Sequence, residues 1–165
     1  MHSNDHSHLL IDGYNVIHAC PDLRSRFLQC AESARKLLVE QVRVIHDVDV
    51  RYVSVVFDGS GPELTFEHPG NQPTFTVIFS SNSLTADDII EQLVLKSNHP
   101  KEFTIISADN MIKSSVRSAG AVVFNPDYLF DWVEHCSQRQ ARVVEAQRKR
   151  QSKSWQSISP WDALG

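Results

Sequence analysis

The chain has 165 residues, of which 41% are hydrophobic and 22% are charged, values that are ordinary for a soluble globular domain. At this length one hydrophobic core is large enough to stabilise a fold, so neither disulfides nor a structural metal ion is required for stability. No apolar stretch approaches the ~20 residues that a membrane-spanning helix needs. Composition therefore excludes an integral membrane protein.

The net charge of −4 is unevenly distributed along the chain. Residues 139–165 hold six Lys or Arg and two Asp or Glu, a balance of +4, whereas residues 1–138 carry −8. We expect the basic segment to contact RNA phosphates through its cations; the alternative is a solvated helix end without a partner. The candidate nucleic-acid-binding residues are Arg139, Arg142, Arg148, Lys149, Arg150 and Lys153.

The termini and the cysteines indicate the compartment. The first residues lack the apolar centre of a secretory signal. The three cysteines are an odd number without a CxxC pair, which is typical of reduced thiols. We predict a cytoplasmic protein that does not associate with membranes, with a flexible N-terminus at residues 1–7, one domain at 8–138 and a C-terminal extension at 139–165 that is partly helical and flexible after about Arg150.

Apolar runs and amphipathic segments alternate along the chain. Runs that are apolar or rich in β-branched residues predict buried strands, and they occupy residues 8–11, 51–57, 74–79, 103–106 and 121–124. Two of them stop at Asp-Gly pairs, which are typical of turns. The loop at 60–73 has room for one further short strand, around residues 64–66. Apolar spacing of three and four predicts helices, which cover 28–45, 85–98, 111–118 and a segment after Pro126.

This alternation predicts the fold class. Each helix that connects two parallel strands must pack back onto the sheet, so helices cover both faces. We predict an α/β fold with three layers, α/β/α, around a mainly parallel sheet of about five strands.

Acidic residues follow the strands of this predicted sheet repeatedly. Asp12 and Asp58 each come directly after a strand, Asp109 lies three residues beyond another, and Asp87 and Asp88 open the helix after residue 85. Ligands of open parallel sheets bind beyond the carboxyl ends of the strands. We therefore expect these side chains to converge at one edge of the sheet.

Carboxylates that converge repel one another unless a counter-charge is present. Oxygen ligands without a His or Cys cluster favour Mg²⁺ or Mn²⁺ over zinc. Such an ion suits phosphodiester hydrolysis because it activates water and neutralises charge on the phosphate. The sequence thus predicts a metal site formed by Asp12, Asp58, Asp87 and Asp109, with Asp88 as a further candidate.

Each acid also has a purely structural interpretation. Asp12 and Asp58 precede glycines and would form turns. Asp87 and Asp88 would complement a helix N-terminus, with Asp88 and Thr85 forming a capping box. Asp109 would cap the next helix. Their joint occurrence at one predicted edge favours function.

Four ordered segments resemble one known family. They are LLIDGYNVI at 9–17, VVFD at 55–58, TAD at 85–87 and ISAD at 106–109. This set resembles the NYN group of PIN-like ribonucleases, in particular its YacP-like branch, over roughly residues 9–133. The resemblance implies a PIN-like fold and a metal-dependent site that cleaves RNA.

The resemblance also implies roles for individual residues. The family's acids match Asp12, Asp58, Asp87 and Asp109. Asn15 matches an asparagine that would orient a metal-bound water or an acid, and Ser107 matches a small hydroxyl residue before the last acid. Two positions depart from the family pattern: Asn110 replaces an arginine, and Asp88 replaces a neutral residue.

These inferences predict a ribonuclease in which a metal-activated water attacks an RNA phosphodiester, most simply at an internal position of the strand. The RNA is either free or on the ribosome. Asp12 and Asp87 are the expected principal ligands. The alternative is a non-catalytic module of the same fold that binds RNA or the ribosome. A haloacid dehalogenase phosphatase is disfavoured because Tyr14 stands where that enzyme needs a second aspartate. A nucleotide cofactor is not expected, because Gly13 is not followed by the glycines of a dinucleotide-binding fingerprint.

Overall fold

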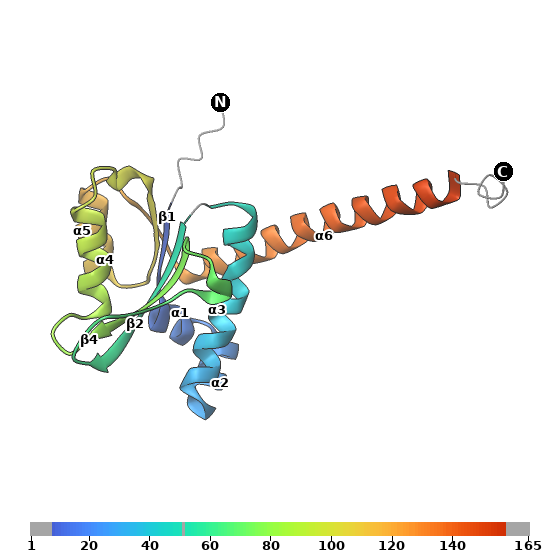
Figure 1. The fold of residues 1–165 in the computed structure, drawn as a ribbon. Coiled ribbons are helices and arrows are strands. Elements are labelled where there is room, and N and C mark those ends of the chain that lie inside the picture. Colours follow the sequence, from blue (N-terminus) through green and yellow to red (C-terminus); the bar gives the residue numbers. More distant parts are fainter. Residues whose placement is uncertain (1–7, 51, 158–165) are drawn as a thin grey trace.

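The computed structural model describes residues 8–50 and 52–157 (Figure 1). Its strands are β1 (His8–Asp12), β2 (Tyr52–Gly61), β3 (Thr65–Glu67), β4 (Phe75–Ser81), β5 (Phe103–Ile106) and β6 (Val122–Phe124). Its helices are α1 (Gly13–Ala19), α2 (Pro21–Gln29), α3 (Ala31–Val48), α4 (Ala86–Leu95), α5 (Asn110–Ser118) and α6 (Pro126–Ser157). Short 3₁₀ turns lie at Pro69–Asn71 and Pro100–Glu102.

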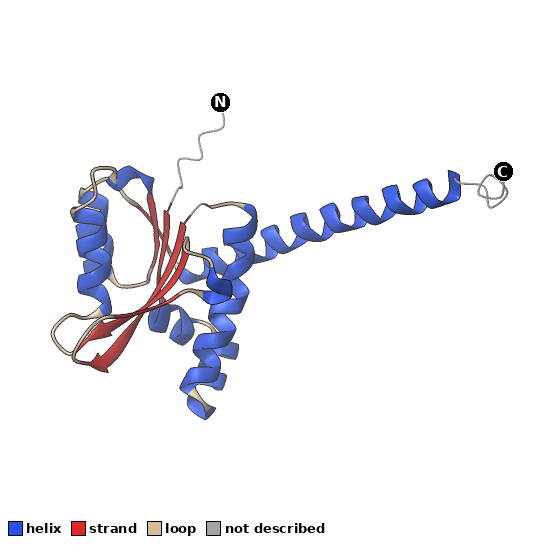
Figure 2. Ribbon diagram, in the orientation of Figure 1, coloured by secondary structure: helices blue, strands red, loops and turns tan. Residues whose placement is uncertain are grey.

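The strands form one sheet in the order β3-β4-β2-β1-β5-β6. Every neighbouring pair is parallel except β3 with β4, which is antiparallel. Helices lie on both faces of the sheet (Figure 2). The prediction of a three-layer, mainly parallel α/β fold is therefore confirmed, with the short strand of the 60–73 loop as the sixth member.

Strand β1 shows how the sequence builds both cores. Side chains alternate between the two faces of a strand, and Leu9 and Ile11 join the core that packs under α1, α3 and α6. Leu10, between them, joins the core under α4 and α5. All three are fully buried, which explains why this run is apolar without alternation.

The chain after β1 differs from the expected Asp-Gly turn. It enters α1 directly at Gly13, and α2 follows after one extended residue, Cys20. The apolar repeat that began at Leu28 is also interrupted, because Leu28 lies on α2 with 78% of its surface exposed. Cys30 has an extended backbone, so α3 begins at Ala31.

Strand β2 is longer than expected. It continues through Asp58 and Gly59 to Gly61, which pairs with Ser81 of β4 after a register irregularity. The Gly59 amide donates to Ser80 Oγ at 3.0 Å. Pairing with β4 therefore overrides the local preference of the Asp-Gly pair for a turn.

Helix α6 runs from Pro126 to Ser157 and projects away from the domain (Figure 1). At 1.5 Å per residue it is roughly 48 Å long. The helix continues past Arg150, where we expected helical structure to end, because no glycine or proline interrupts it before Pro160. The predictions of flexibility for residues 1–7 and 158–165 concern residues outside the described part of the chain. None of the helices described is long and apolar enough to cross a membrane.

Candidate active site

The carboxyl end of β1 is the topological switch point of the sheet. From β1 the chain builds outward through β2 and β4, and it then returns through α4 to β5 on the other side of β1. Open α/β sheets bind ligands at such a point, where connections diverge and leave a crevice. Asp12 is the last residue of β1 and therefore lies at this point.

Asp12 is a buried carboxylate, with 7% of its surface exposed. Ser107, which follows β5, donates a hydrogen bond from Oγ to Asp12 Oδ2 at 3.1 Å. The pKa of Asp12 is raised to about 7, by burial first and also by repulsion from Asp87, Asp58 and Asp109, against the opposing effect of the Ser107 hydrogen bond. The four predicted acids thus lie near enough to act on one another electrostatically.

Asp87, in the first turn of α4, belongs to the same electrostatic group. Its pKa is raised by partial burial first, and then by Asp109, Asp58 and two acids of its own helix, Glu91 and Asp88. Repulsion with Asp58 and Asp109 is common to Asp12 and Asp87. A cation at this edge would relieve both carboxylates.

Asp58 and Asp109 are held by helix N-termini. Asp58 Oδ1 accepts a hydrogen bond from the backbone amide of Ala86, the first residue of α4, at 2.9 Å. Asp109 is the N-cap of α5 and accepts from the Met111 amide at 2.8 Å. The positive ends of the helix dipoles offset part of the repulsion among these carboxylates.

Asn15 and Ser107 fix the loop that carries Asp109. Asn15 Oδ1 accepts from the Ala108 amide at 2.7 Å, and Ser107 Oγ accepts from the Asp109 amide at 3.0 Å. The resemblance implied that Asn15 orients a bound water or an acid. In the structure its amide oxygen contacts the backbone of this loop, so it positions the acid through the loop.

Thr85 and Asp88 form a complete capping box at α4. Thr85 Oγ1 accepts from the Asp88 amide at 3.2 Å, and Asp88 Oδ2 accepts from the Thr85 amide at 3.0 Å. This arrangement is the structural alternative that the sequence had left open for Asp88. Its carboxylate serves the helix cap, and we do not include Asp88 among the ligands proposed below.

The donor set fits a hard divalent cation. In the described ranges, no group of three or more His, Cys, Asp or Glu side chains lies close enough together to hold a metal ion. The expected cage of four carboxylates is therefore not formed. Mg²⁺ instead commonly binds through one or two carboxylates and takes its other ligands from water and substrate phosphate. Asp12, buried and with a pKa near 7, is a carboxylate whose ionised form needs such a counter-charge.

Comparison with known proteins identifies the family. The family model of the YacP-like NYN domain matches residues 9–163. The chain belongs to the YacP-like NYN domain family. It is similar to the Bacillus subtilis protein named "Uncharacterized protein YacP", with 28% identity over 137 residues that cover 82% of this chain and 80% of the relative.

Two solved structures carry the same NYN fold. A crystal structure of Rae1 (YacP) from Bacillus subtilis has a TM-score of 0.67 and 27% identity, and it covers 88% of this chain and 84% of its own. A mutant of the same protein has a TM-score of 0.69 and 26% identity, with 87% and 84% covered. These likenesses, with the strand order described above, confirm the PIN-like fold predicted from the four motifs.

The basic residues of helix α6 of this NYN domain protein lie in different environments. Arg139 pairs with Asp49 at 3.1 Å, and Trp132 donates to the same carboxylate at 2.8 Å. Arg139 therefore fastens α6 to the end of α3, a role that sequence reasoning did not assign. The remaining basic candidates are exposed: Arg142, Arg148, Lys149, Arg150 and Lys153.

Helical periodicity sorts these exposed cations. At about 100° per residue, Arg142, Lys149 and Lys153 fall within an arc of roughly 40°, whereas Arg148 lies about 120° away from the centre of this arc. Lys149 also contacts Glu145 at 3.7 Å. We call Arg142, Lys149 and Lys153 the basic stripe.

Arg35 of α3 was missed by sequence reasoning. It donates to the Tyr14 hydroxyl at 3.0 Å, and both residues line a cleft of about 470 Å³ that also contains Asp58. The sequence offered no signal for Arg35, because a cation within an amphipathic helix is ordinarily a solvated residue of its polar face. Only the packing of α3 beside β2 and β4 brings it towards the acids.

Proposed function

We propose that the protein is a metal-dependent ribonuclease that hydrolyses internal phosphodiester bonds of RNA. The observation that carries this proposal is the environment of Asp12: a buried carboxylate with its pKa raised to about 7, at the switch point of an NYN fold and under repulsion from three further acids. Here four carboxylates act on one another electrostatically, which favours the binding of a divalent metal ion between them.

Asp12 and Asp87 are the proposed direct ligands of Mg²⁺ or Mn²⁺, with Asp58 and Asp109 contributing negative charge around them. When bound, the ion would lower the pKa of a water molecule and neutralise charge on the phosphate. Ser107 holds Asp12 in place and favours its ionised form, since its hydrogen bond lowers the pKa of that carboxyl. Asn15 keeps the Asp109 loop beside β1.

RNA is the proposed substrate, free or on the ribosome, and the basic stripe is its proposed electrostatic contact outside the acidic site. Exposed cations on a projecting helix contact phosphates without competing for the metal. The proposed compartment is the cytoplasm, supported by the three free thiols Cys20, Cys30 and Cys136.

The test is cleavage of a single-stranded RNA labelled at its 5′ end, with Mn²⁺ or Mg²⁺ present. The proposal expects internal fragments from the wild type and a loss of at least about 100-fold in rate for Asp12→Asn and Asp87→Asn, as for removal of a group that stabilises transition-state charge. The matched control is Asp131→Asn, an exposed carboxylate of α6, which should keep full activity. Metal-dependent cleavage that persists in Asp12→Asn overturns the assignment.

A non-catalytic RNA-binding module is the second candidate. It is favoured by the lack, in the described residues, of a ready-made group of three metal ligands. RNA binding that matches between wild type and Asp12→Asn, with no cleavage by either, supports this candidate against the nuclease.

A further inference from the structure

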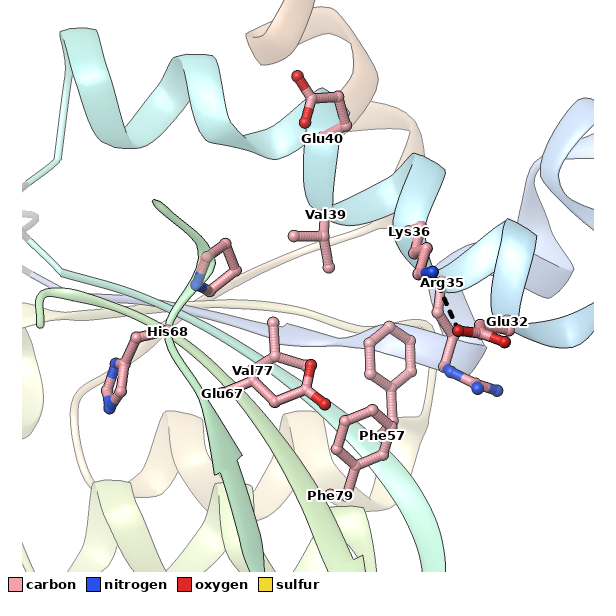
Figure 3. Close-up of a pocket in the computed structure, with 11 residues that line it drawn as sticks. Glu32, Arg35, Lys36, Val39, Glu40, Phe57, Glu67, His68, Val77 and Phe79 are labelled. Carbon is pink, nitrogen blue, oxygen red and sulfur yellow. Dashed lines mark ion pairs between the residues drawn. The ribbon is translucent and has the colours of Figure 1, made fainter. Parts of the chain in front are cut away.

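A second cleft lies on the α3 side of the sheet, between α3 and strands β2, β3 and β4 (Figure 3). Its volume is about 520 Å³, within the range of small-ligand sites. The rings of Phe57 and Phe79 form its floor, with centroids 5.7 Å apart and planes inclined by 27°. Phe57 is fully buried, whereas Phe79 is partly exposed. Phe79 is therefore the ring that a ligand in this cleft would meet.

This cleft is continuous with the surroundings of the acidic site. Arg35 and Phe79 line both this cleft and the smaller one that contains Asp58. Phe57 directly precedes Asp58, and its ring packs against Gly13, the neighbour of Asp12; a Cβ atom on Gly13 would lie 2.3 Å from Phe57 Cε1. One ring of the cleft floor thus belongs to the chain neighbour of Asp58 and packs against the chain neighbour of Asp12.

The charged groups at the rim are of two kinds. Lys36 is paired with Glu32 at 3.0 Å, whereas Arg35 forms no ion pair within the described residues. Its guanidinium lies 5.7 Å from the centre of the Phe79 ring and contacts the Tyr14 hydroxyl. Arg35 therefore offers a positive charge and a planar group on the side of the cleft towards Asp58. Glu40 and Glu67 also line the cleft and offer acceptors only.

We propose that this cleft binds one nucleotide of the RNA strand beside the bond that is cut, with its base on Phe79 and its phosphate on Arg35; the role in cleavage rests on the function proposed above. Bases stack on aromatic rings and guanidinium planes. The lining carries both donors, on Arg35 and Lys36, and acceptors, on Glu40 and Glu67, so a base stacked on Phe79 would find polar partners of either kind.

The experiment follows binding separately from cleavage. Nucleoside 5′-monophosphates are titrated into the full chain without metal, and amide chemical shifts are recorded by NMR. Ribose 5-phosphate is the probe that lacks a base. The test variants are Arg35→Gln and Phe79→Leu; the matched controls are Arg24→Gln on α2 and Phe66→Leu on β3, both exposed and outside the cleft. Folding of every variant is checked by its amide spectrum.

The proposal expects nucleoside monophosphates to shift amides of α3 and β4 in the wild type. Ribose 5-phosphate should bind more weakly than any nucleotide, because it lacks the base that stacks on Phe79. Phe79→Leu and Arg35→Gln should each weaken nucleotide binding by about tenfold, and both controls should match the wild type. Equal binding of ribose 5-phosphate and adenosine monophosphate, or unchanged binding by Phe79→Leu, overturns the proposal.

RNA cleavage distinguishes this proposal from the function it rests on. Nucleotide binding with the expected dependence on Phe79, in a protein that cleaves no RNA, supports the nucleotide site and contradicts the nuclease. Cleavage that is unchanged in both Phe79→Leu and Arg35→Gln supports the nuclease and contradicts the nucleotide site.

Discussion

Ser107 Oγ donates a hydrogen bond to Asp12 Oδ2 at 3.1 Å, across 95 positions of the chain. The same hydroxyl oxygen accepts from the Asp109 amide at 3.0 Å. One fully buried serine thus connects the acid at the end of β1 to the loop that carries another acid after β5. This relationship sets both the position and the charge state of Asp12.

Ser107→Ala should therefore affect stability and the titration of Asp12 together. It removes a hydrogen bond to a carboxylate and leaves a backbone amide without its partner, which should cost about 1–3 kcal/mol in the free energy of unfolding. The pKa of Asp12 should rise further, because the Ser107 bond lowers it. Urea unfolding and the pH profile of RNA cleavage measure the two effects. Ser114→Ala, at an exposed position of α5, is the control; an unshifted pH profile would show that Ser107 does not influence Asp12.

Asp12→Asn should make the protein more stable at pH 8. The pKa of Asp12 is raised from 3.8 to about 7 in the folded state, so between these values the folded protein holds a proton that the unfolded chain releases. Stability therefore falls as the pH rises through this window. At about 1.4 kcal/mol per pKa unit, the gain from the neutral amide should be on the order of 1–3 kcal/mol at pH 8, and the pH dependence between 4 and 7 should flatten. Thermal unfolding between pH 4 and 8 measures this pH dependence of stability, with Asp131→Asn as the control. Equal pH dependence in wild type and Asp12→Asn would refute the raised pKa of Asp12.

Gly13→Ala should disturb the site through packing alone. A Cβ atom at this position would overlap the buried Phe57 ring, at 2.3 Å from Cε1, and overpacking of this kind costs about 1–3 kcal/mol. Movement of the ring would also displace its neighbour Asp58. Denaturant unfolding and cleavage rate should both decline. Gly61→Ala is the matched control, since its Cβ would lie at an ordinary 3.7 Å from the Glu63 carbonyl oxygen; equal stability of the two variants would contradict this account.

Neutralising the basic stripe should reduce the salt dependence of RNA binding. With Arg142, Lys149 and Lys153 all changed to Gln, the slope of log affinity against log salt concentration should become shallower by about 2, from roughly 0.7 per phosphate contact on a single strand. Affinity measured between 50 and 200 mM salt tests this. Arg148→Gln, about 120° around the helix from the basic stripe, should leave the slope unchanged. Equal slopes for the wild type and the triple variant would assign RNA contact to another surface.

The sequence was sufficient to predict the sheet and the neighbourhood of the acids. The strand at 103–106 and the cap at Thr85 were predicted where the structure has them, because apolar runs and capping residues act locally. Alternation of strands and helices predicted a mainly parallel sheet covered on both faces. The strand order found in the structure places Asp12 at the switch point. The electrostatic coupling of Asp12 with Asp58, Asp87 and Asp109 agrees with the convergence expected from the strand ends.

Other features depended on tertiary contacts that no local pattern records. The Asp58-Gly59 pair resembles a turn, but pairing with β4 extends the strand through it. In the sequence Arg139 is one cation of a basic run, but in the structure it forms an ion pair with Asp49 at the end of α3. For Asp88 the sequence left two alternatives open, a metal ligand and the capping-box partner of Thr85, and the hydrogen bond to the Thr85 amide shows the cap. Arg35 lies in the same cleft as Asp58 only because α3 packs over the sheet.

Binding of Mn²⁺ followed by calorimetry, without RNA, tests the central claim most directly. The account predicts one saturable site in the wild type that is retained in Asp131→Asn and lost in both Asp12→Asn and Asp87→Asn. Saturable binding of equal affinity in the wild type and Asp12→Asn would contradict it.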